Sequence, residues 1–364
     1  METLVMNFSA YKNKRVFLTG HTGFKGSWLL AWLHSIGAEV KGYSLAPPNE
    51  PSLFHQINGQ ELGESVIADI LDKEKLEKEV VAFEPHFIFH FAAQPLVRLS
   101  YEVPVETFEV NAIGTANVLN AVRKLKAPCV VVCITTDKVY ENREWHYPYR
   151  ETDHLGGYDP YSASKACAEL IISSYRNSFF NLKQYASHQK SIASARAGNV
   201  IGGGDWSKDR IIPDIVTALK NGIAVPVRNP KSIRPWQHVL EPLAGYLQLG
   251  LKMQEDPIKY ADAWNFGPYL EDDITVEELV KIAIETWGTG TMEVVQTEHA
   301  PHEAGLLKLD INKTIHEIGW RPRMDAATAI ATTIDWYRNA SSSSAYELLK
   351  ADIEQYSQAE IEVL

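Results

Sequence analysis

The sequence lacks any apolar run of about 18 residues, the length that a membrane-spanning helix needs. Its beginning shows no basic region followed by a long apolar stretch, so we expect no secretory signal. It has only three cysteines, Cys129, Cys133 and Cys167, without C-x-x-C spacing. An odd number of thiols argues against a disulfide framework. Together these absences predict a cytoplasmic protein with reduced thiols.

Positive charge is also scarce. The chain has 35 Lys and Arg residues and 46 Asp and Glu residues, which gives a net charge of −11. Proteins that bind duplex DNA or anionic membranes usually present a basic face, so we expect neither partner. A few local arginines can still bind a phosphate inside an acidic protein. No cluster of His, Cys, Asp and Glu has metal-ligand spacing, and no metal site is predicted.

The first half of the chain alternates short apolar runs with longer helical patterns. Several runs are apolar without alternation, which is typical of parallel strands covered on both faces. We predict strands at Arg15–Thr19, Glu39–Ser44, Ser65–Ala68, His86–Phe91 and Cys129–Thr135. We predict helices from near Gly26 to Gly37, over about Leu71–Phe83 and Val105–Leu125, and at Met324–Asn339. This order indicates an α/β fold with a doubly wound parallel Rossmann sheet.

The 364 residues, of which 45% are hydrophobic, are enough for a large α/β domain and a smaller lobe. The regular alternation ends near Asn199, where Gly, Pro, Arg and Trp become dense. We therefore predict a Rossmann domain over 1–200, rejoined by about 235–267. A smaller C-terminal substrate-binding lobe should comprise 201–234 and 268–340, followed by a C-terminal tail over 341–364.

The segment Thr19–Gly26 reads TGHTGFKG and lies between the first predicted strand and the first predicted helix. Glycine permits a tight turn and a close approach of backbone to a pyrophosphate, and the helix N-terminus offers unpaired N–H groups. The position favours a dinucleotide site over the alternative, a glycine-rich turn without a ligand. The predicted cofactor contacts in this loop are Gly20, Thr22, Gly23, Phe24, Lys25 and Gly26.

The adenine end of the predicted site is less well defined. No acid or arginine follows the second strand, where Tyr43–Ala46 reads YSLA. The residue type that usually distinguishes an NAD site from an NADP site is therefore absent at this position. Asp69 and its neighbour Ile70, after the third strand, are predicted to contact the adenine. Asp69 could equally cap the Leu71 helix, and the two roles are compatible.

A tyrosine and a lysine stand four residues apart in Asp159–Lys165, DPYSASK. Asp159 is expected at the N-cap and Pro160 at the first helical position, which places Tyr161 and Lys165 on one helix face. A tyrosine base at neutral pH must lose about three pKa units, or about 4 kcal/mol. An ammonium about 4 Å away at an effective dielectric of about 20 supplies a similar energy. Such a pair is common on helix surfaces, but its place downstream of the glycine loop predicts a catalytic pair.

The glycine motif, the segment Phe91–Gln94 and the Tyr161/Lys165 pair together resemble the extended short-chain dehydrogenases. The resemblance covers nearly the whole chain, as far as Gly319–Pro322. It implies NAD as cofactor, held also by Tyr161 and Lys165. Further cofactor contacts implied are Phe91, Ala92, Ala93, Gln94 and Asn111. It also implies a homodimer or a dimer of dimers, paired through Val105–Leu125 and Tyr161–Phe179.

Longer strings narrow the resemblance to nucleotide-sugar 4,6-dehydratases of the branch that acts on CDP-glucose: GHTGFKGSWL, TTDKVY at Thr135–Tyr140, GGGDW at Gly202–Trp206 and RPWQHV at Arg234–Val239. The resemblance implies a lyase that forms CDP-4-keto-6-deoxyglucose for deoxysugar synthesis, such as that of lipopolysaccharide O-antigen. Alternatives are another nucleotide-sugar dehydratase, a 4-epimerase, or a non-catalytic binding protein of the same fold.

By this similarity, Thr136 should hydrogen-bond the sugar's 4-hydroxyl and Asp137 should protonate the departing 6-hydroxyl. Related dTDP-sugar dehydratases have glutamate next, as the base for carbon 5, whereas this chain has Lys138. A lysine must be neutral to act as a base, so Lys138 is either that base or an ion-pair partner. An epimerase eliminates nothing from carbon 6, and Asp137 and Lys138 therefore argue against that alternative.

The nucleotide end of the substrate needs positive charge in the smaller lobe. Arg210, Arg228 and Arg234 are the predicted phosphate ligands, because arginine suits bidentate contact. The resemblance adds three further substrate contacts: Asn199, Asn265 and His302. Trp206 and Trp236 could line the pocket, but packing is the expected role for both.

Overall fold

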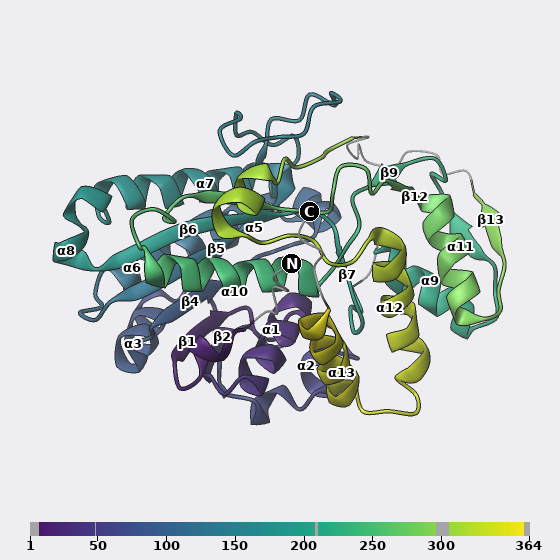
Figure 1. Ribbon diagram of the computed structural model, residues 1–364, viewed down its shortest axis with the longest axis horizontal. Helices are drawn as coiled ribbons and strands as arrows, with labels where there is room; N and C mark the ends of the chain where they lie inside the picture. The colour runs from purple at the N-terminus through teal and green to yellow at the C-terminus, as the bar shows by residue number, and fades with distance from the viewer. Residues whose placement is uncertain (1–6, 48, 208–209, 296–305, 360–364) are drawn as a thin grey trace, which may run out of the picture.

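The computed structural model describes residues 7–47, 49–207, 210–295 and 306–359. Its centre is a seven-stranded sheet with the order β11-β6-β5-β4-β1-β2-β3 (Figure 1). All neighbouring strands are parallel. The strands are β1 (Arg15–Thr19), β2 (Glu39–Ser44), β3 (Glu64–Ile67), β4 (Phe87–His90), β5 (Cys129–Ile134), β6 (Lys190–Ala197) and β11 (Ala263–Phe266). The doubly wound parallel fold is therefore confirmed.

The five predicted strands all form, two of them with the predicted bounds and three with ends shifted by a residue or so. The sequence analysis missed β6 and β11, which extend the sheet beyond β5. In the register of the sheet, Thr19 lies opposite both Tyr43 of β2 and His90 of β4. The carboxyl ends of β1, β2 and β4 consequently meet at one edge, where Rossmann-type sheets bind their ligands.

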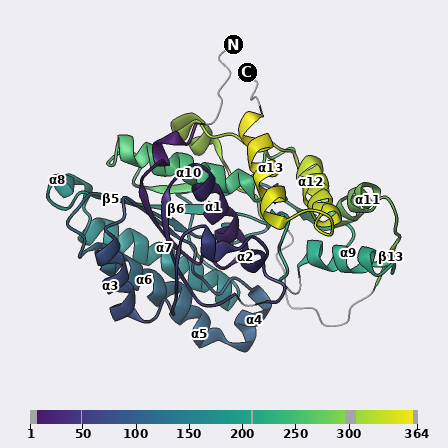
Figure 2. The same cartoon turned by 90° about the horizontal axis from the view of Figure 1, so that it is seen from below.

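Helices cover both faces of the sheet (Figure 2). Phe17, Ile88 and Val131 point into the core beneath α3 (Lys73–Phe83), α6 (Gly114–Val122) and α7 (Pro160–Ser178). Their chain neighbours Leu18 and Phe89 point to the opposite core, beneath α1 (Phe24–Ser35) and α10 (Leu240–Glu255). The alternation follows from the two-residue period of a strand. Shorter helices are α2 (Leu53–Gln56), α4 (Val97–Glu102), α5 (Pro104–Phe108) and α8 (Tyr185–His188).

The predicted helix Val105–Leu125 is not one α-helix. It consists of α5, a π-helical turn at Glu109–Ile113 and α6. A π-helical turn inside an α-helix shifts the faces of the residues that follow. Here the turn contains Asn111, whose side chain is buried.

A smaller lobe lies beside the sheet, at the right of Figure 1. Its elements are α9 (Ile211–Lys220), β8 (Val225–Val227), β9 (Ile233–Arg234), β12 (Ile274–Thr275), α11 (Val276–Trp287), β13 (Met292–Val294) and α12 (Ala326–Asn339). The short pair β7 (Val200–Ile201) and β10 (Gln237–His238) connects it to the body. Among the described residues, no helix is long and apolar enough to cross a membrane.

The segment predicted as a C-terminal tail forms a helix, α13 (Ala345–Gln358). Ser344 caps it, since its side chain accepts a hydrogen bond from the Glu347 N–H. The helix packs on α1, where the rings of Trp32 and Tyr356 meet edge to face at 6.0 Å. The buried apolar stripe of Ala345, Leu349, Ile353 and Tyr356 explains why this segment docks instead of extending into solvent.

Candidate functional site

The glycine loop joins β1 to α1, and Gly23 is the N-cap of that helix. Two of its glycines are required by the protein itself. Gly20 has a φ of 75°, and a Cβ there would lie 2.8 Å from the Ala92 nitrogen, while a Cβ on Gly26 would lie 2.0 Å from the Gly20 oxygen. A Cβ on Gly23 would meet only the Gly20 oxygen, at 3.4 Å. Gly23 therefore leaves open space at a helix N-terminus, which fits a bound phosphate.

The loop is anchored to the ends of the neighbouring strands. The Thr22 hydroxyl donates to the Leu45 carbonyl at 2.8 Å and lies 2.9 Å from the Ser44 hydroxyl. The Thr19 hydroxyl accepts from the Ala92 N–H at 3.1 Å. These side chains are occupied in fixing the loop, and its backbone remains the part that can face a ligand.

Asp69 is exposed and accepts a hydrogen bond from the Leu71 N–H at 2.9 Å, so it stabilises a turn. The helix cap that the sequence assigned to Asp69 belongs to Asp72, which accepts from the Lys75 N–H, because α3 begins at Lys73. The cap role was thus misplaced. The predicted contacts of Asp69 and Ile70 with adenine stay predictions.

Two predicted cofactor residues, Gln94 and Asn111, are tied to each other at the end of β4. The Asn111 carboxamide accepts from the Gln94 N–H at 2.9 Å and donates to the Gln94 carbonyl at 3.1 Å. It also donates to the Ser164 hydroxyl of α7 at 2.8 Å. Asn111 therefore holds the loop Phe91–Gln94 against the helix that carries Tyr161.

Lys25 points into the protein. Its Nζ donates to the Tyr246 hydroxyl at 3.1 Å and lies 5.1 Å from the centre of that ring. The pKa of Lys25 is lowered to about 7, mainly by burial and also by the positive charges of Lys165 and Arg210, while the Asp137 charge acts in the opposite direction. This lysine thus lies close enough to the catalytic residues to sense their charge.

The predicted catalytic helix α7 begins as expected, with Asp159 accepting from the Ser162 N–H at 2.9 Å and Pro160 at its first position. Tyr161 and Lys165 are both buried on this helix. The Lys165 Nζ donates to the Ile134 carbonyl at 3.1 Å. Because Ile134 ends β5, the lysine joins α7 to the strand that leads into Thr136.

Burial dominates the titration of both groups. The pKa of Tyr161 is raised to about 12, mainly by burial and also by the Asp137 charge, although Thr136 and Arg210 act in the opposite direction. Burial likewise lowers the pKa of Lys165 to about 8. The expected activation of the phenol by Lys165 is therefore not what the protein alone provides. The Lys165 amino group donates to a backbone carbonyl, and burial is the largest influence on the pKa of the phenol.

Thr136 and Asp137 lie where β5 ends and a short 3-10 turn, Asp137–Val139, begins. The Thr136 hydroxyl donates to Asp137 Oδ1 at 2.9 Å, and Asp137 is 3% exposed. Lys138 Nζ lies 4.0 Å from the same oxygen, and its side chain is 33% exposed. Lys138 thus forms an ion pair with the predicted acid, which is one of the two roles that the sequence left open.

A buried ion pair beneath this segment was missed by the sequence analysis. Arg196 donates to both oxygens of Glu169, at 3.0 and 2.8 Å, and the Thr135 hydroxyl donates to Glu169 at 2.5 Å. Arg196 also donates to the Tyr140 hydroxyl at 2.8 Å. The pair therefore fixes both ends of the TTDKVY segment. The spacing of Glu169, four residues after Lys165, was the available signal.

Of the predicted phosphate ligands, Arg210 lies nearest the catalytic residues. It pairs with Asp205 at 3.1 Å, and its charge lowers the pKa values of both Lys25 and Tyr161. Arg228 is exposed at the end of β8, and Arg234 is half-buried in β9. The three arginines belong to three different parts of the lobe: Arg210 is the N-cap of α9, Arg228 follows β8 and Arg234 lies in β9.

The three substrate contacts taken from the resemblance differ in their surroundings. Asn199 is half-buried after β6, and its carbonyl accepts from the Gln237 N–H. Asn265 is fully buried, where it donates to the Tyr149 and Asp310 carbonyls and accepts from the Tyr140 hydroxyl. Its amide thus has no donor left for a ligand. His302 lies outside the described residues.

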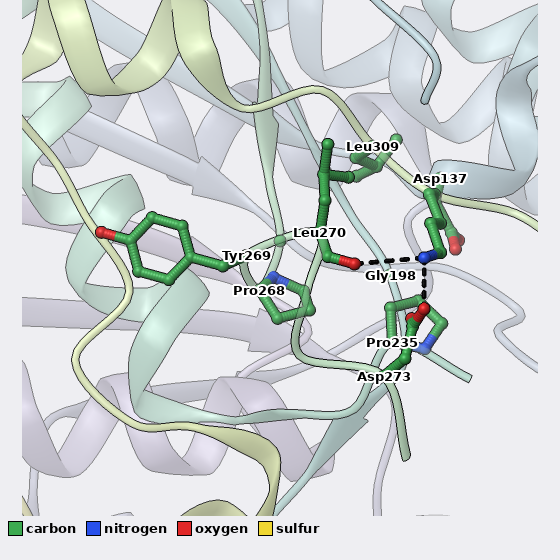
Figure 3. A pocket seen from close by; sticks show the side chains of 10 residues that line it. Asp137, Gly198, Pro235, Pro268, Tyr269, Leu270, Asp273 and Leu309 are labelled. Carbon is green, nitrogen blue, oxygen red and sulfur yellow. Dashed lines mark hydrogen bonds and ion pairs between the residues drawn. The ribbon is translucent and has the colours of Figure 1, made fainter. Parts of the chain in front are cut away.

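A pocket opens beside Asp137, between the sheet and the smaller lobe (Figure 3). Lys308 spans one side of it, donating to the Leu270 carbonyl at 3.1 Å and pairing with Asp273. The Tyr269 ring points away from the pocket, while Pro235, Leu309 and Gly198 line it (Figure 3). Trp206 and Trp236 are not among the lining residues; Trp236 is buried, as expected for packing.

Among the described parts of the chain, no group of three or more His, Cys, Asp or Glu residues could hold a metal ion.

Comparisons with known proteins agree with this geometry. The family model described as GDP-mannose 4,6 dehydratase matches residues 17–333. A CDP-glucose 4,6-dehydratase of Salmonella typhimurium is 51% identical over 90% of this chain and 91% of its own length. A dTDP-glucose 4,6-dehydratase of Streptomyces antibioticus is 30% identical over 69% of this chain and 70% of its own length.

Among solved structures, DesIV, a dTDP-glucose 4,6-dehydratase from Streptomyces venezuelae with NAD and TYD bound, has a TM-score of 0.74. It is 24% identical, and the match covers 89% of this chain and 97% of that one. This likeness shows the fold, and the sequence matches show the family. The chain belongs to the GDP-mannose 4,6-dehydratase family of extended short-chain dehydrogenases.

Proposed function

We propose that this protein is an NAD-dependent hydro-lyase that converts CDP-glucose to CDP-4-keto-6-deoxyglucose and water. The observation that carries the proposal is the position of the Thr136 hydroxyl. It donates to Asp137 at 2.9 Å and lies close enough to Tyr161 to lower the pKa of that phenol, so an acid and a phenol meet at one buried point. The name of the Salmonella typhimurium relative, 51% identical, supports CDP-glucose as the substrate.

The residues present fit a dinucleotide. The open side of Gly23 and the N-terminus of α1 would hold the pyrophosphate, and the loop at Phe91–Gln94 would face the nicotinamide ribose beside Lys165. When bound, NAD would supply a hydride acceptor for carbon 4, a hydride donor for carbon 6, and a fixed positive charge near the phenol.

Tyr161 acts as the base for the 4-hydroxyl. Its pKa, raised to about 12 by burial, must fall before it can take a proton near neutral pH. The Thr136 hydrogen bond and the Arg210 charge both lower it. Thr136 can pass its hydrogen bond to the sugar's 4-hydroxyl and so hold that oxygen beside the phenol.

Asp137 acts as the acid for the elimination. Once carbon 4 is a ketone, the hydrogen on carbon 5 becomes acidic and leaves as a proton. Its electron pair forms a double bond between carbons 5 and 6, the bond from carbon 6 to oxygen breaks, and Asp137 protonates the departing hydroxyl as water. A water positioned by Lys138, which lies 4.0 Å from Asp137, takes the proton from carbon 5, or Lys138 itself takes it in its neutral form.

The smaller lobe holds the nucleotide in this proposal, with Arg210 as the pyrophosphate ligand and Arg228 and Arg234 as further contacts. Asn265 would act through the position of Tyr140 and not by touching the substrate. The proposed division into a cofactor domain (1–200 with about 235–267) and a substrate lobe puts the reacting sugar between the two. The free thiols Cys129, Cys133 and Cys167 favour work in the reducing cytoplasm.

The subunits would pair through α5–α6 and α7. Exposed apolar side chains gather on these elements and their neighbour α4: Tyr101, Val105, Ile113, Leu170 and Phe179. Such side chains on packed neighbouring helices mark an interaction surface. A symmetric dimer would bury each copy of the patch against the same patch of the other.

The test is incubation of the purified protein with CDP-glucose, followed by alkali, which gives 4-keto sugars an ultraviolet absorbance. A signal with CDP-glucose and none with GDP-mannose, dTDP-glucose or UDP-glucose is expected. A signal with another nucleotide sugar alone would move the substrate assignment. Conversion of a UDP-sugar to its 4-epimer would overturn the dehydratase assignment, and ligand binding without any reaction would make the protein a binding module.

A further inference from the structure

Gly198 lines the pocket beside Asp137 (Figure 3). Its backbone conformation does not require a glycine. It is not among the glycines with positive φ, so an alanine could adopt its conformation. The reason for a glycine at this position must lie in the space around it.

A side chain on Gly198 would enter the gap in front of the acid. Its Cβ would lie 3.1 Å from Asp137 Oδ2, 3.6 Å from Asp137 Cγ and 3.9 Å from Pro235 Cγ. The other oxygen of Asp137, Oδ1, already accepts from Thr136. Gly198 therefore keeps open the side of the carboxylate that remains available for a ligand.

The remaining pocket wall suits a small group with one hydroxyl. Pro235 and Leu309 are apolar, and Lys308 and Asp273, the other charged lining residues in the described chain, pair with each other. Asp137 is thus the one lining charge whose ion-pair partner, Lys138, is not a lining residue. A hydroxymethyl group would place its methylene on the apolar wall and its oxygen on Asp137, whereas a carboxylate would be repelled.

We propose that Gly198 determines the specificity of the site, because its missing side chain leaves the place where the hydroxymethyl group of the hexose docks against Asp137. The inference rests on the proposed dehydration. It adds that the sugar must carry an unsubstituted 6-hydroxyl, and that one methyl group at position 198 would move this hydroxyl away from the acid.

The test compares wild type with Gly198→Ala by titration calorimetry, using CDP-glucose and CDP-xylose, which is the same sugar without carbon 6. The affinity of the variant for CDP-glucose should fall by about tenfold, while its affinity for CDP-xylose should stay within about twofold of wild type. Equal loss for both ligands, or loss for neither, overturns the proposal.

Turnover gives a second readout. In Gly198→Ala, oxidation of carbon 4 should continue while elimination slows by about 100-fold, since a displacement near 1 Å can cost that much. Reduced nicotinamide should then accumulate ahead of deoxy product. The matched control is Gly267→Ala in the same pocket, because the atoms nearest to a Cβ there belong to Leu309 and Ile311, at 3.7 Å or more, and not to Asp137. That variant should keep the wild-type ratio of product to reduced nicotinamide, and the same shift in both variants contradicts the assignment.

A third experiment uses only the wild-type protein, and it tests the proposal even if Gly198→Ala fails to fold. Wild type should bind CDP-glucose methylated on its 6-hydroxyl at least tenfold more weakly than CDP-xylose, because the methyl group has no room in front of Asp137. Equal affinity overturns the proposal. If wild type binds these two ligands as expected but forms no 4-keto product from CDP-glucose, the proposed dehydration is wrong while the proposed docking place in the pocket stands.

Discussion

The Lys165 amino group donates a hydrogen bond of 3.1 Å to the carbonyl oxygen of Ile134, the last residue of β5. This bond ties the helix that carries Tyr161 to the strand whose end carries Thr136 and Asp137. The relative position of the phenol and the acid therefore depends on a lysine that is bonded to backbone. In the protein alone, this lysine orders the site, and burial keeps its pKa lowered to about 8.

Tyr161→Phe removes the hydroxyl that takes the proton from the sugar. Turnover should fall by about 1,000-fold, within the range for loss of a general base, because hydride can leave carbon 4 only as its hydroxyl is deprotonated. Binding of NAD, measured by calorimetry, should change little. Turnover close to wild type would mean that another group is the base.

Asp137→Asn keeps the shape of the acid but removes its proton. Oxidation of carbon 4 should continue, and elimination should slow by 100-fold or more, about the contribution of a general acid. Stopped-flow absorbance should show nicotinamide reduction without deoxy product. Thr136→Ala is a useful comparison, because it should slow oxidation as well. If Asp137→Asn slows both steps equally, its role as the acid is wrong.

Two glycines of the same loop should respond differently to alanine. Gly26→Ala forces a Cβ to within 2.0 Å of the Gly20 oxygen and should destabilise the fold by about 2 kcal/mol. In Gly23→Ala the new Cβ would lie 3.4 Å from the Gly20 oxygen, so the melting temperature of this variant should stay close to that of wild type. Its NAD affinity should nevertheless fall by about tenfold, because the methyl group enters the phosphate space. Normal NAD binding by a folded Gly23→Ala protein would exclude this loop as the cofactor site.

Glu241, 1% exposed, gives the fold a pH dependence. Burial raises its pKa from 4.5 to about 7. Between these values the folded state binds more protons at Glu241 than the unfolded state, so the contribution of Glu241 to stability is greatest below pH 4.5 and falls as pH rises to 7. The loss is on the order of 3 kcal/mol.

Glu241→Gln should remove this slope, and denaturant unfolding at pH 5 and pH 8 measures it. The amide can still accept from the Arg323 and Met324 N–H groups, as Glu241 does at 2.8 and 2.7 Å. The difference in unfolding free energy between variant and wild type should therefore grow with pH. A difference independent of pH would show that Glu241 titrates normally.

Leu170→Glu tests the proposed dimer. Leu170 is 59% exposed on α7, and a charge there should separate the subunits, as light scattering would report. Ile223→Glu is the control, since Ile223 is 58% exposed but lies in the smaller lobe. A wild-type protein that is already monomeric, or a dimer in the Leu170 variant, would contradict the surface chosen.

The sequence predicts the first half of the fold well because its signals are local. The glycine loop, the apolar strands and the cap at Asp159 each act within a few residues, and all form as predicted. The helix α13 was missed because 341–364 was predicted as a C-terminal tail, although Ser344 is the cap of this helix. The strands β6 and β11 carry polar residues whose burial depends on distant partners, as Arg196 depends on Glu169.

The candidate site likewise has residues that local motifs predicted and features that depend on distant parts of the chain. Motifs located Thr136, Asp137, Tyr161 and Lys165, but they could not give the direction of the pKa of Tyr161, which depends on burial by the whole domain. Asn265 was predicted as a substrate contact from the resemblance, yet its amide group already bonds Tyr149, Asp310 and Tyr140. Gly198 carries no motif signal, since the space it leaves exists only when Asp137 and Pro235 come together.

The most direct test of the account follows the hydrogen on carbon 4. The protein is supplied with NAD and CDP-glucose deuterated at carbon 4, and the product is examined by nuclear magnetic resonance. We predict a 4-keto-6-deoxy sugar with deuterium in its methyl group, because one site oxidises carbon 4 and reduces carbon 6. Deuterium lost to water, or CDP-glucose recovered unchanged, would contradict the central claim.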